Sequence, residues 1–344
     1  MDFNLYKASS KDTTVPRPGV TFNYRYFFSP AAEGKPTVLF LHGFPSNGYE
    51  CWRHQAAFFV DLGFGVLIPD LLGYGGTSKP QEVEAYAKSL MAGDIISILE
   101  KENLQGKGTR IYAIGHDWGC ALTSGLATFH PDRFAGFAFL SFGYLKPNPN
   151  FKIAEFYKNY AAIAGYDECF GYWEFFKTPK AAETIEAHMD AFLSLLYPKD
   201  PITWKTNMAP EGKLQEWVES DTKTDPLSSL KPEDFERQKA ELLKGGMTGP
   251  LNWYKQYALE EVAKDDKLVP PENYTIKKPV FFAATSLDYI CVPNGSSAFM
   301  DASTCPTLTR KTYETDHWVQ LAEGARDILN RDLLAWIKEF EVRQ

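Results

Sequence analysis

The stretch Ile114-Gly115-His116-Asp117-Trp118-Gly119 follows a run of apolar residues and precedes a helix-like run, residues 120–129. Glycines on either side of Asp117 are what a strained turn between closely approaching segments requires. In this strand–turn–helix context a nucleophile, usually a serine, stands on the sharp turn. The alternative, a turn with a capping Asp, is common for short glycine motifs. We interpret Asp117 as the nucleophile.

A carboxylate nucleophile implies a different reaction from a serine. A serine alkoxide attacks an acyl carbon, whereas a carboxylate displaces a leaving group at an alkyl carbon and becomes an alkyl ester. Water must then attack the carbonyl carbon of the Asp117 ester, which releases the alcohol and restores the enzyme. The sequence therefore predicts a covalent intermediate that is hydrolysed in a second step.

Apolar runs of strand length alternate with helical patterns on both sides of this turn. The runs are residues 37–41, 65–70, 110–115, 137–141 and 278–284, with an edge-type strand at 307–313, and the helical patterns include 86–101 and 325–340. Strands that are apolar on both faces and alternate with helices indicate a mostly parallel sheet covered by helices on both sides. The chain is therefore predicted to be an α/β protein.

The pattern changes between residues 146 and 266, where it becomes helical, rich in aromatic residues and broken by prolines. We predict a core formed by residues 1–145 and 267–344, interrupted by a helical cap at 146–266. Such a cap would lie over the carboxyl edge of the sheet, where open α/β sheets bind ligands.

A histidine base and an orienting acid should follow the nucleophile along the chain. Of six histidines, only His188 and His317 lie well beyond Asp117, and His188 falls inside the helical segment. His317 follows the last predicted strand and can activate water near neutral pH. Asp288, just after the strand at 278–284, is the predicted acid. Asp316 is a rival, although adjacent side chains rarely reach each other's ring nitrogens.

The segment His42-Gly43-Phe44-Pro45 follows the first strong strand. We expect the backbone N–H groups of Phe44 and Trp118 to form an oxyanion hole for the tetrahedral intermediate on Asp117. His42, Pro45 and Trp318 are predicted to border the substrate pocket.

Composition excludes several classes of partner. The formal net charge of −8 argues against nucleic acid or an anionic membrane as a partner. No stretch approaches the roughly 20 apolar residues of a membrane span. The N-terminus lacks a signal-peptide pattern, and five cysteines without CxxC spacing indicate reduced, mostly buried thiols. We expect a cytoplasmic monomer or homodimer that needs no metal or organic cofactor.

The chain resembles the soluble epoxide hydrolases of the α/β-hydrolase superfamily over nearly its whole length. The segments that carry the resemblance are His42–Pro45, Gly73–Pro80, Gly115–Gly119, Gly249–Lys255 and Asp316–Gln320. It implies an α/β-hydrolase fold with a helical cap and conversion of epoxides to vicinal diols. The aromatic cluster at residues 151–176 separately suggests apolar epoxides. The resemblance also implies that two cap tyrosines, Tyr254 and Tyr172, bind the epoxide oxygen, with Tyr166 as a competitor for the second role.

Phenols suit that role because epoxide opening develops an alkoxide that must be protonated. The chain departs from the family pattern at Asp316, where a Gly commonly precedes the histidine, at Leu72, where an Arg often stands, and at residues 284–287. None of these departures removes a catalytic group, but Asp316 is placed to raise the pKa of His317.

Other readings of the same residues remain open. A haloalkane dehalogenase shares the Asp and Trp118 but needs a second halide donor, and Phe44 cannot serve as one. Trp118 also counts against a fluoroacetate dehalogenase, which commonly carries Arg there. A catalytically dead receptor would lack part of the triad. The aromatic residues from Phe151 to Phe176 either line an apolar tunnel or form the core of the cap.

Overall fold

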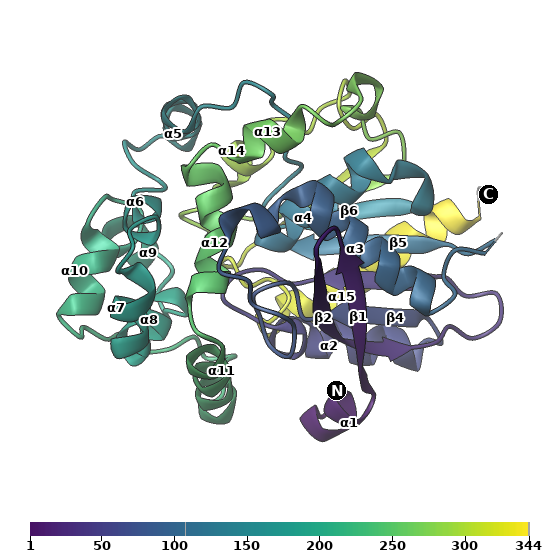
Figure 1. Cartoon of the computed structure of the whole chain (residues 1–344), viewed down its shortest axis with the longest axis horizontal. Coiled ribbons are helices and arrows are strands. Elements are labelled where there is room, and N and C mark those ends of the chain that lie inside the picture. The colour runs from purple at the N-terminus through teal and green to yellow at the C-terminus, as the bar shows by residue number, and fades with distance from the viewer. Residues whose placement is uncertain (107, 343–344) are drawn as a thin grey trace.

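A computed structural model describes residues 1–106 and 108–342. One eight-stranded sheet runs through the molecule in the order β1-β2-β4-β3-β5-β6-β7-β8 (Figure 1). The strands are β1 (Ser10–Arg17), β2 (Val20–Ser29), β3 (Thr37–Leu41), β4 (Gly65–Pro69), β5 (Ile111–His116), β6 (Gly136–Leu140), β7 (Val280–Thr285) and β8 (Leu308–Tyr313). From β4 to β8 all pairings are parallel, which confirms the predicted α/β sheet.

The first two strands were not expected from the sequence. β1 and β2 form an antiparallel hairpin, and β2 pairs antiparallel with β4 at the edge of the sheet. β1 is mostly exposed and contains Pro16, which only an edge strand tolerates. The sequence of β1 is almost entirely polar, so it lacks the alternation of apolar and polar residues by which a half-buried strand is recognised.

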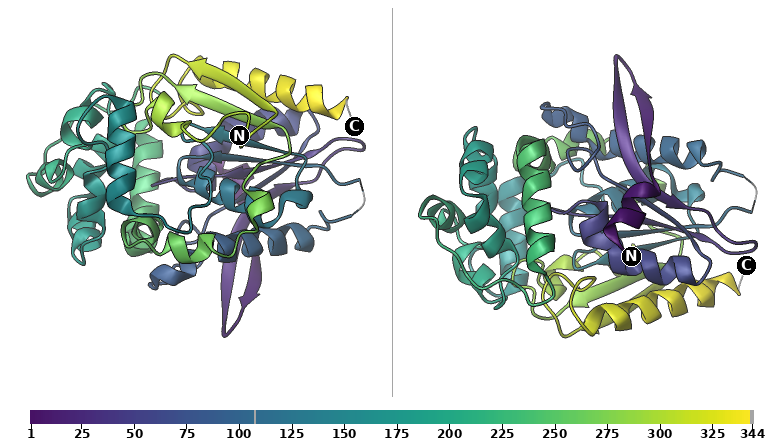
Figure 2. Two further views of the ribbon diagram at one scale, coloured as in Figure 1. Left: turned by 90° about the horizontal axis from the view of Figure 1, so that it is seen from above. Right: turned by 90° about the horizontal axis from the view of Figure 1, so that it is seen from below.

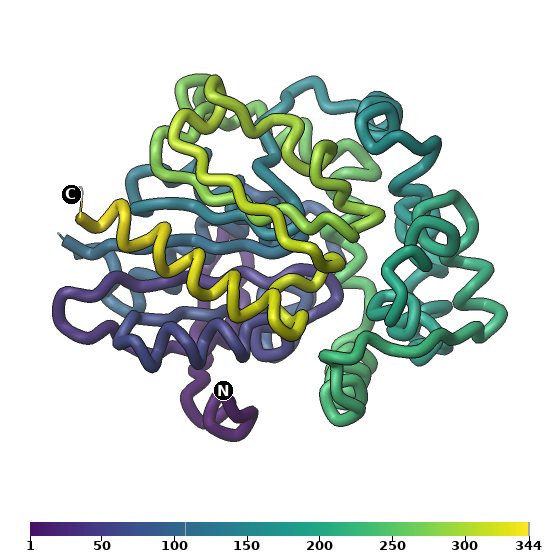
Figure 3. Tube along the Cα trace, turned by 180° about the vertical axis from the view of Figure 1, so that it is seen from behind, coloured from purple at the N-terminus to yellow at the C-terminus, as the bar shows by residue number. Residues whose placement is uncertain are grey.

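Alternate strand residues supply two separate hydrophobic layers. Leu39, Leu41 and Phe139 pack on one face, in a core that includes helices α3 (Lys88–Lys101) and α4 (Trp118–Phe129). Val38 and Phe40 pack on the other face, against α2 (Gly48–Asp61) and α15 (Ala325–Glu341), and α15 crosses the sheet in Figure 3. Both faces of the central strands β3 to β7 are buried, because these strands are apolar at nearly every position.

Helices joined by loops, with one isolated β-bridge between Pro198 and Pro226, form the chain between β6 and β7. Figure 2 shows most of these helices as a separate layer beyond one end of the sheet. They are α5 (Ile153–Ala164), α6 (Tyr172–Phe176), α7 (Ala181–Ala187), α8 (Met189–Leu196), α9 (Thr203–Asn207), α10 (Lys213–Glu219), α11 (Pro232–Gly245), α12 (Thr248–Ala258) and α13 (Val262–Asp266). We call this segment the cap. Its division from the core at residues 146 and 266 stays a prediction.

Buried ion pairs join the cap to the core. Arg53 in α2 contacts Asp234 in α11 with an N–O distance of 3.0 Å, and Arg237 binds both Asp234 and Glu50. Breaking such a pair leaves an uncompensated buried charge, so these contacts fix where α11 sits.

The remaining short helices are α1 (Phe3–Ala8), η1 (Val83–Tyr86), η2 (Pro131–Arg133), η3 (Pro271–Asn273) and α14 (Pro293–Ser296). Among the described residues, no helix combines the length and apolar character needed to cross a membrane. All five cysteines are buried, as their sequence context indicated.

Candidate active site

Asp117 stands between the end of β5 and the start of α4, in the strand–turn–helix context that its sequence indicated. Its φ of 52° and ψ of −123° are a conformation that residues with side chains rarely adopt. Gly119 makes this turn possible, because a Cβ there would lie 2.1 Å from the Leu41 carbonyl oxygen. The tight approach of β3 holds the Asp117 carboxylate at the carboxyl edge of the sheet.

The two oxygens of the Asp117 carboxylate have different surroundings. Oδ1 accepts a hydrogen bond of 2.8 Å from the backbone N–H of Phe44, whereas Oδ2 lies 3.7 Å from Nε2 of His317. Burial raises the Asp117 pKa, and the His317 charge and the Trp118 and Phe44 N–H groups oppose that rise. The N–H groups predicted for the oxyanion hole therefore already face this carboxylate.

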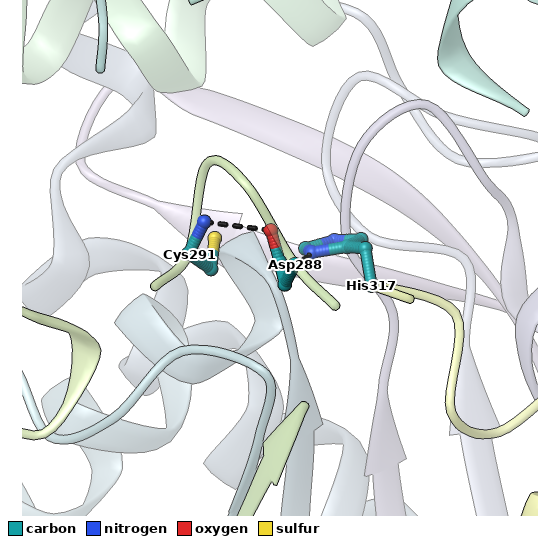
Figure 4. A group of neighbouring side chains, drawn as sticks. All are labelled: Asp288, Cys291 and His317. Carbon is teal, nitrogen blue, oxygen red and sulfur yellow. Dashed lines mark hydrogen bonds and ion pairs between the residues drawn. The ribbon is translucent and has the colours of Figure 1, made fainter. Parts of the chain in front are cut away.

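The His317 ring reaches Asp117 on one side and Asp288 on the other. Its Nδ1 lies 2.6 Å from Oδ2 of Asp288. The other Asp288 oxygen accepts N–H groups from Ile290 at 3.0 Å and Cys291 at 2.8 Å (Figure 4). With Nδ1 engaged, Nε2 is the nitrogen left for chemistry at Asp117.

Asp316, the rival acid, has another partner. Its Oδ1 accepts the Trp318 N–H at 2.9 Å. Burial of the His317 imidazole would lower its pKa, but the Asp288, Asp117 and Asp316 carboxylates together raise it above 6.5. Asp316 thus acts on the histidine through its charge.

Two further residues position His317, and the sequence analysis missed both. The His317 carbonyl oxygen accepts a hydrogen bond of 2.7 Å from Ser141 Oγ and lies 2.9 Å from His116 Nε2. Ser141 follows β6 and adopts a φ of 67°, and His116 precedes Asp117. Their only sequence signal is their place at strand ends, because the contacts run through backbone atoms.

The cap places Tyr172, at the start of α6, and Tyr254, in α12, over Asp117. Their ring centroids lie 5.9 Å apart, and the Tyr254 ring packs edge-on against Trp118 and Phe44. Burial raises the pKa of both phenols well above 10, so both remain protonated donors. Tyr166 lies elsewhere and donates its hydroxyl to the Tyr289 carbonyl.

The cavity beside Asp117 is small, about 40 Å³. Its walls include Trp118, Phe156, Phe170, Tyr172, Trp173, Tyr254, Tyr257 and Cys291. The Phe151–Phe176 cluster therefore divides: Phe156, Phe170 and Trp173 face this cavity, while Tyr166 lies away from it.

His42, Pro45 and Trp318, which were predicted to border the substrate pocket, are not among the residues that line this cavity. His42 Nε2 accepts the Leu71 N–H at 2.9 Å, so its ring holds the neighbouring loop. Trp318 stacks on Tyr197 with a centroid distance of 4.4 Å. Pro45 lines a separate groove, together with Ser46 and Tyr74.

Asp288, Cys291 and His317 could offer metal ligands, since one ligand atom of each lies within 4.8 Å of the others (Figure 4). However, both Asp288 oxygens and His317 Nδ1 are already used in mutual or backbone hydrogen bonds. Their arrangement is accounted for by the acid–histidine pair.

Comparison with known proteins gives consistent matches. Residues 36–323 match the family described as alpha/beta hydrolase fold. Epoxide hydrolase 2 of Siraitia grosvenorii is 31% identical over 231 residues, which are 65% of this chain and 67% of that protein. Bifunctional epoxide hydrolase 2 of Rattus norvegicus is 28% identical over 94% of this chain, which spans only 54% of that relative. The structure of epoxide hydrolase A from Mycobacterium thermoresistibile superposes with a TM-score of 0.74 at 25% identity, covering 96% of this chain and 98% of that one.

Proposed function

The chain belongs to the α/β-hydrolase fold family and, within it, to the epoxide hydrolases, and we propose that it converts epoxides to vicinal diols through an ester on Asp117. One observation carries the proposal. A single carboxylate meets a backbone N–H at 2.8 Å through one oxygen and lies 3.7 Å from the His317 base through the other, beneath two protonated phenols.

In the first step a carboxylate oxygen of Asp117 attacks one epoxide carbon, and the C–O bond to the ring oxygen breaks. The developing alkoxide takes a proton from Tyr172 or Tyr254. Both tyrosines line the cavity that contains Asp117, which supports this role. The products of the step are a hydroxyalkyl ester on Asp117 and a phenolate that must be reprotonated.

In the second step His317 takes a proton from water through Nε2, and the hydroxide attacks the carbonyl carbon of the ester. The Phe44 and Trp118 N–H groups bind the oxyanion. Collapse of the tetrahedral intermediate releases the diol and restores the Asp117 carboxylate. The proton on His317 returns to the phenolate, so the net reaction is epoxide plus water giving diol.

Asp288 is proposed to hold His317 in the tautomer that leaves Nε2 unprotonated, through the 2.6 Å contact to Nδ1. The cytoplasmic location and a monomeric or homodimeric state also remain predictions.

The test traps the ester. We expect the His317→Gln variant, mixed with styrene oxide, to gain the mass of the epoxide on the peptide that contains Asp117. The double variant His317→Gln/Asp117→Asn is the control and should gain nothing. A wild-type single turnover in H₂¹⁸O should leave one ¹⁸O in the Asp117 carboxylate, because water attacks the ester carbonyl.

A different result would redirect the assignment. If wild type formed no diol and the variant no adduct, the epoxide proposal would fail, and haloalkanes would be tested next. Diol formation with ¹⁸O only in the diol would mean direct attack of water on the epoxide and would remove Asp117 from the role of nucleophile.

A further inference from the structure

A second, larger chamber lies against the catalytic cavity. Its volume is about 320 Å³, and four residues, Phe142, Leu145, Phe156 and Tyr257, line both spaces. Helix α5 and the segment after α14 contribute to its walls, and Ile163 and Phe299 bring exposed apolar surface to its rim. The chamber and the cavity that holds Asp117 therefore share a wall.

The volumes of the two spaces indicate that they bind different parts of the substrate. A single water needs roughly 10–15 Å³ by this kind of measure, so the inner cavity of about 40 Å³ holds only the reacting carbons and their immediate substituents. Sites that enclose a whole organic ligand are usually some hundreds of Å³. A larger substrate must place its remaining arm in the outer chamber.

Tyr257 stands at the junction and is only 6% exposed. The Lys88 ammonium lies beside its hydroxyl oxygen, and the hydroxyl has no acceptor for its own proton among the described residues. The centroid of the Tyr257 ring lies 5.1 Å from that of Trp118 and 5.7 Å from that of Phe151, and these contacts fix the position of the ring. A buried O–H group without an acceptor costs free energy, and a bound ligand that supplies an acceptor recovers it.

Charged groups around Tyr257 indicate what that ligand group must be. Burial raises the pKa of Tyr257 to about 12, and the nearby Lys88 ammonium opposes the rise. The Lys88 ammonium is attracted to the lone pairs of the Tyr257 oxygen, so the O–H group of Tyr257 stays free to donate. Lys88 is itself bonded to Asp266 at 2.7 Å, and Asp265 adds a second negative charge that acts on Tyr257. An acceptor is therefore favoured, and an anionic one is not.

We propose that Tyr257 selects epoxides whose apolar arm carries a neutral hydrogen-bond acceptor, such as a carbonyl or ether oxygen, and that its hydroxyl donates to that oxygen. The proposal rests on the epoxide hydrolase function, because it assigns the part of the substrate that does not react. It makes Tyr257 a specificity residue, distinct from the two tyrosines over Asp117.

The test measures selectivity. The panel is 1,2-epoxyoctane and analogues in which one methylene of the arm, moved along the chain, is replaced by a carbonyl. We expect wild type to prefer one oxygenated member over the plain epoxide by about tenfold in kcat/KM. In Tyr257→Phe the ratio should fall to about one, while Tyr313→Phe, whose hydroxyl bonds Asp332 far from the chamber, should keep the wild-type ratio.

The outcomes separate this inference from the function on which it rests. If wild type hydrolyses no member of the panel, the proposed function itself fails. If it hydrolyses plain and oxygenated members equally, or if Tyr257→Phe retains the preference, only the role of Tyr257 is overturned. A preference lost equally in Tyr313→Phe would show a general loss of packing and would also overturn it.

Discussion

The core and the cap hold their functional side chains by different means. In the core, Asp288 receives two backbone N–H groups, and Asp117 faces the N–H of Phe44. In the cap, Tyr172 and Tyr254 are held by the rings around them. Directional hydrogen bonds fix a charge to a few tenths of an ångström, whereas packing fixes a ring mainly by shape. Changes in the core should therefore stop the reaction, and changes in the cap should slow it.

Asp288→Asn should have the largest effect. The amide can still accept the two backbone N–H groups, but its NH₂ facing Nδ1 would force the proton of His317 onto Nε2. We expect kcat to fall about 10³-fold, equivalent to about 4 kcal/mol, and the ester on Asp117 to accumulate. Single-turnover kinetics with mass detection would measure both.

If Asp316 were the true orienting acid, the result would differ. Asp288→Asn would then reduce kcat by less than about tenfold, and Asp316→Asn would give the larger loss. That outcome would contradict the conclusion that a carboxylate held by backbone N–H groups, Asp288, orients the catalytic histidine.

Asp234→Ala tests how the core holds the cap. The change removes the carboxylate that pairs with Arg53 and Arg237 and leaves buried guanidinium groups undercompensated. We expect the free energy of unfolding to fall by about 3 kcal/mol, measured by urea denaturation. Asp190→Ala, whose carboxylate is 42% exposed and pairs with Lys239, is the matched control and should cost under about 1 kcal/mol. Equal losses of unfolding free energy in the two variants would show that the ion pairs of Asp234 stabilise the protein no more than an exposed pair does.

The contrast between core and cap also explains which residues of the site can be predicted from the sequence. Asp117 and Asp288 each follow an apolar strand, and His317 follows the polar edge strand β8. The ends of parallel strands meet at one edge, so the meeting of these residues could be predicted. The contacts of Ser141 and His116 with the His317 carbonyl could not, because they depend on backbone direction after the strand. For the cap, the choice of Tyr172 over Tyr166 came from resemblance, since aromatic composition alone does not say which ring faces Asp117.

Tyr254→Phe and Tyr172→Phe test the cap side. Each change removes one hydroxyl and keeps the ring that packs. We expect either variant to lose about 10²-fold in the rate of ester formation, within the usual range for a general acid, because the other phenol still donates. Stopped-flow measurement of that step should leave ester hydrolysis nearly unchanged. Tyr166→Phe is the control, because its hydroxyl binds the Tyr289 carbonyl, and a loss there equal to that of Tyr172→Phe would contradict the assignment.

Asp316→Asn should give the smallest effect and sharpen the electrostatic side of the comparison. In the ester intermediate Asp117 carries no charge, so the carboxylates of Asp288 and Asp316 raise the pKa of His317, while His116, whose pKa burial lowers well below 6.5, faces it uncharged. Ester hydrolysis needs neutral His317, so its rate falls as the pH drops through that pKa. Removing one negative charge lowers the pKa, and the acidic limb should move to lower pH by about half a unit to one unit. Because burial raises the Asp316 pKa as well, its carboxylate is protonated as the pH falls, which keeps the shift of the acidic limb small.

The shift is measured from the single-turnover rate of ester hydrolysis as a function of pH. Asp327→Asn, at an exposed carboxylate, is the control. If the acidic limb did not move in Asp316→Asn, the role of Asp316 would be limited to ordering the Trp318 backbone.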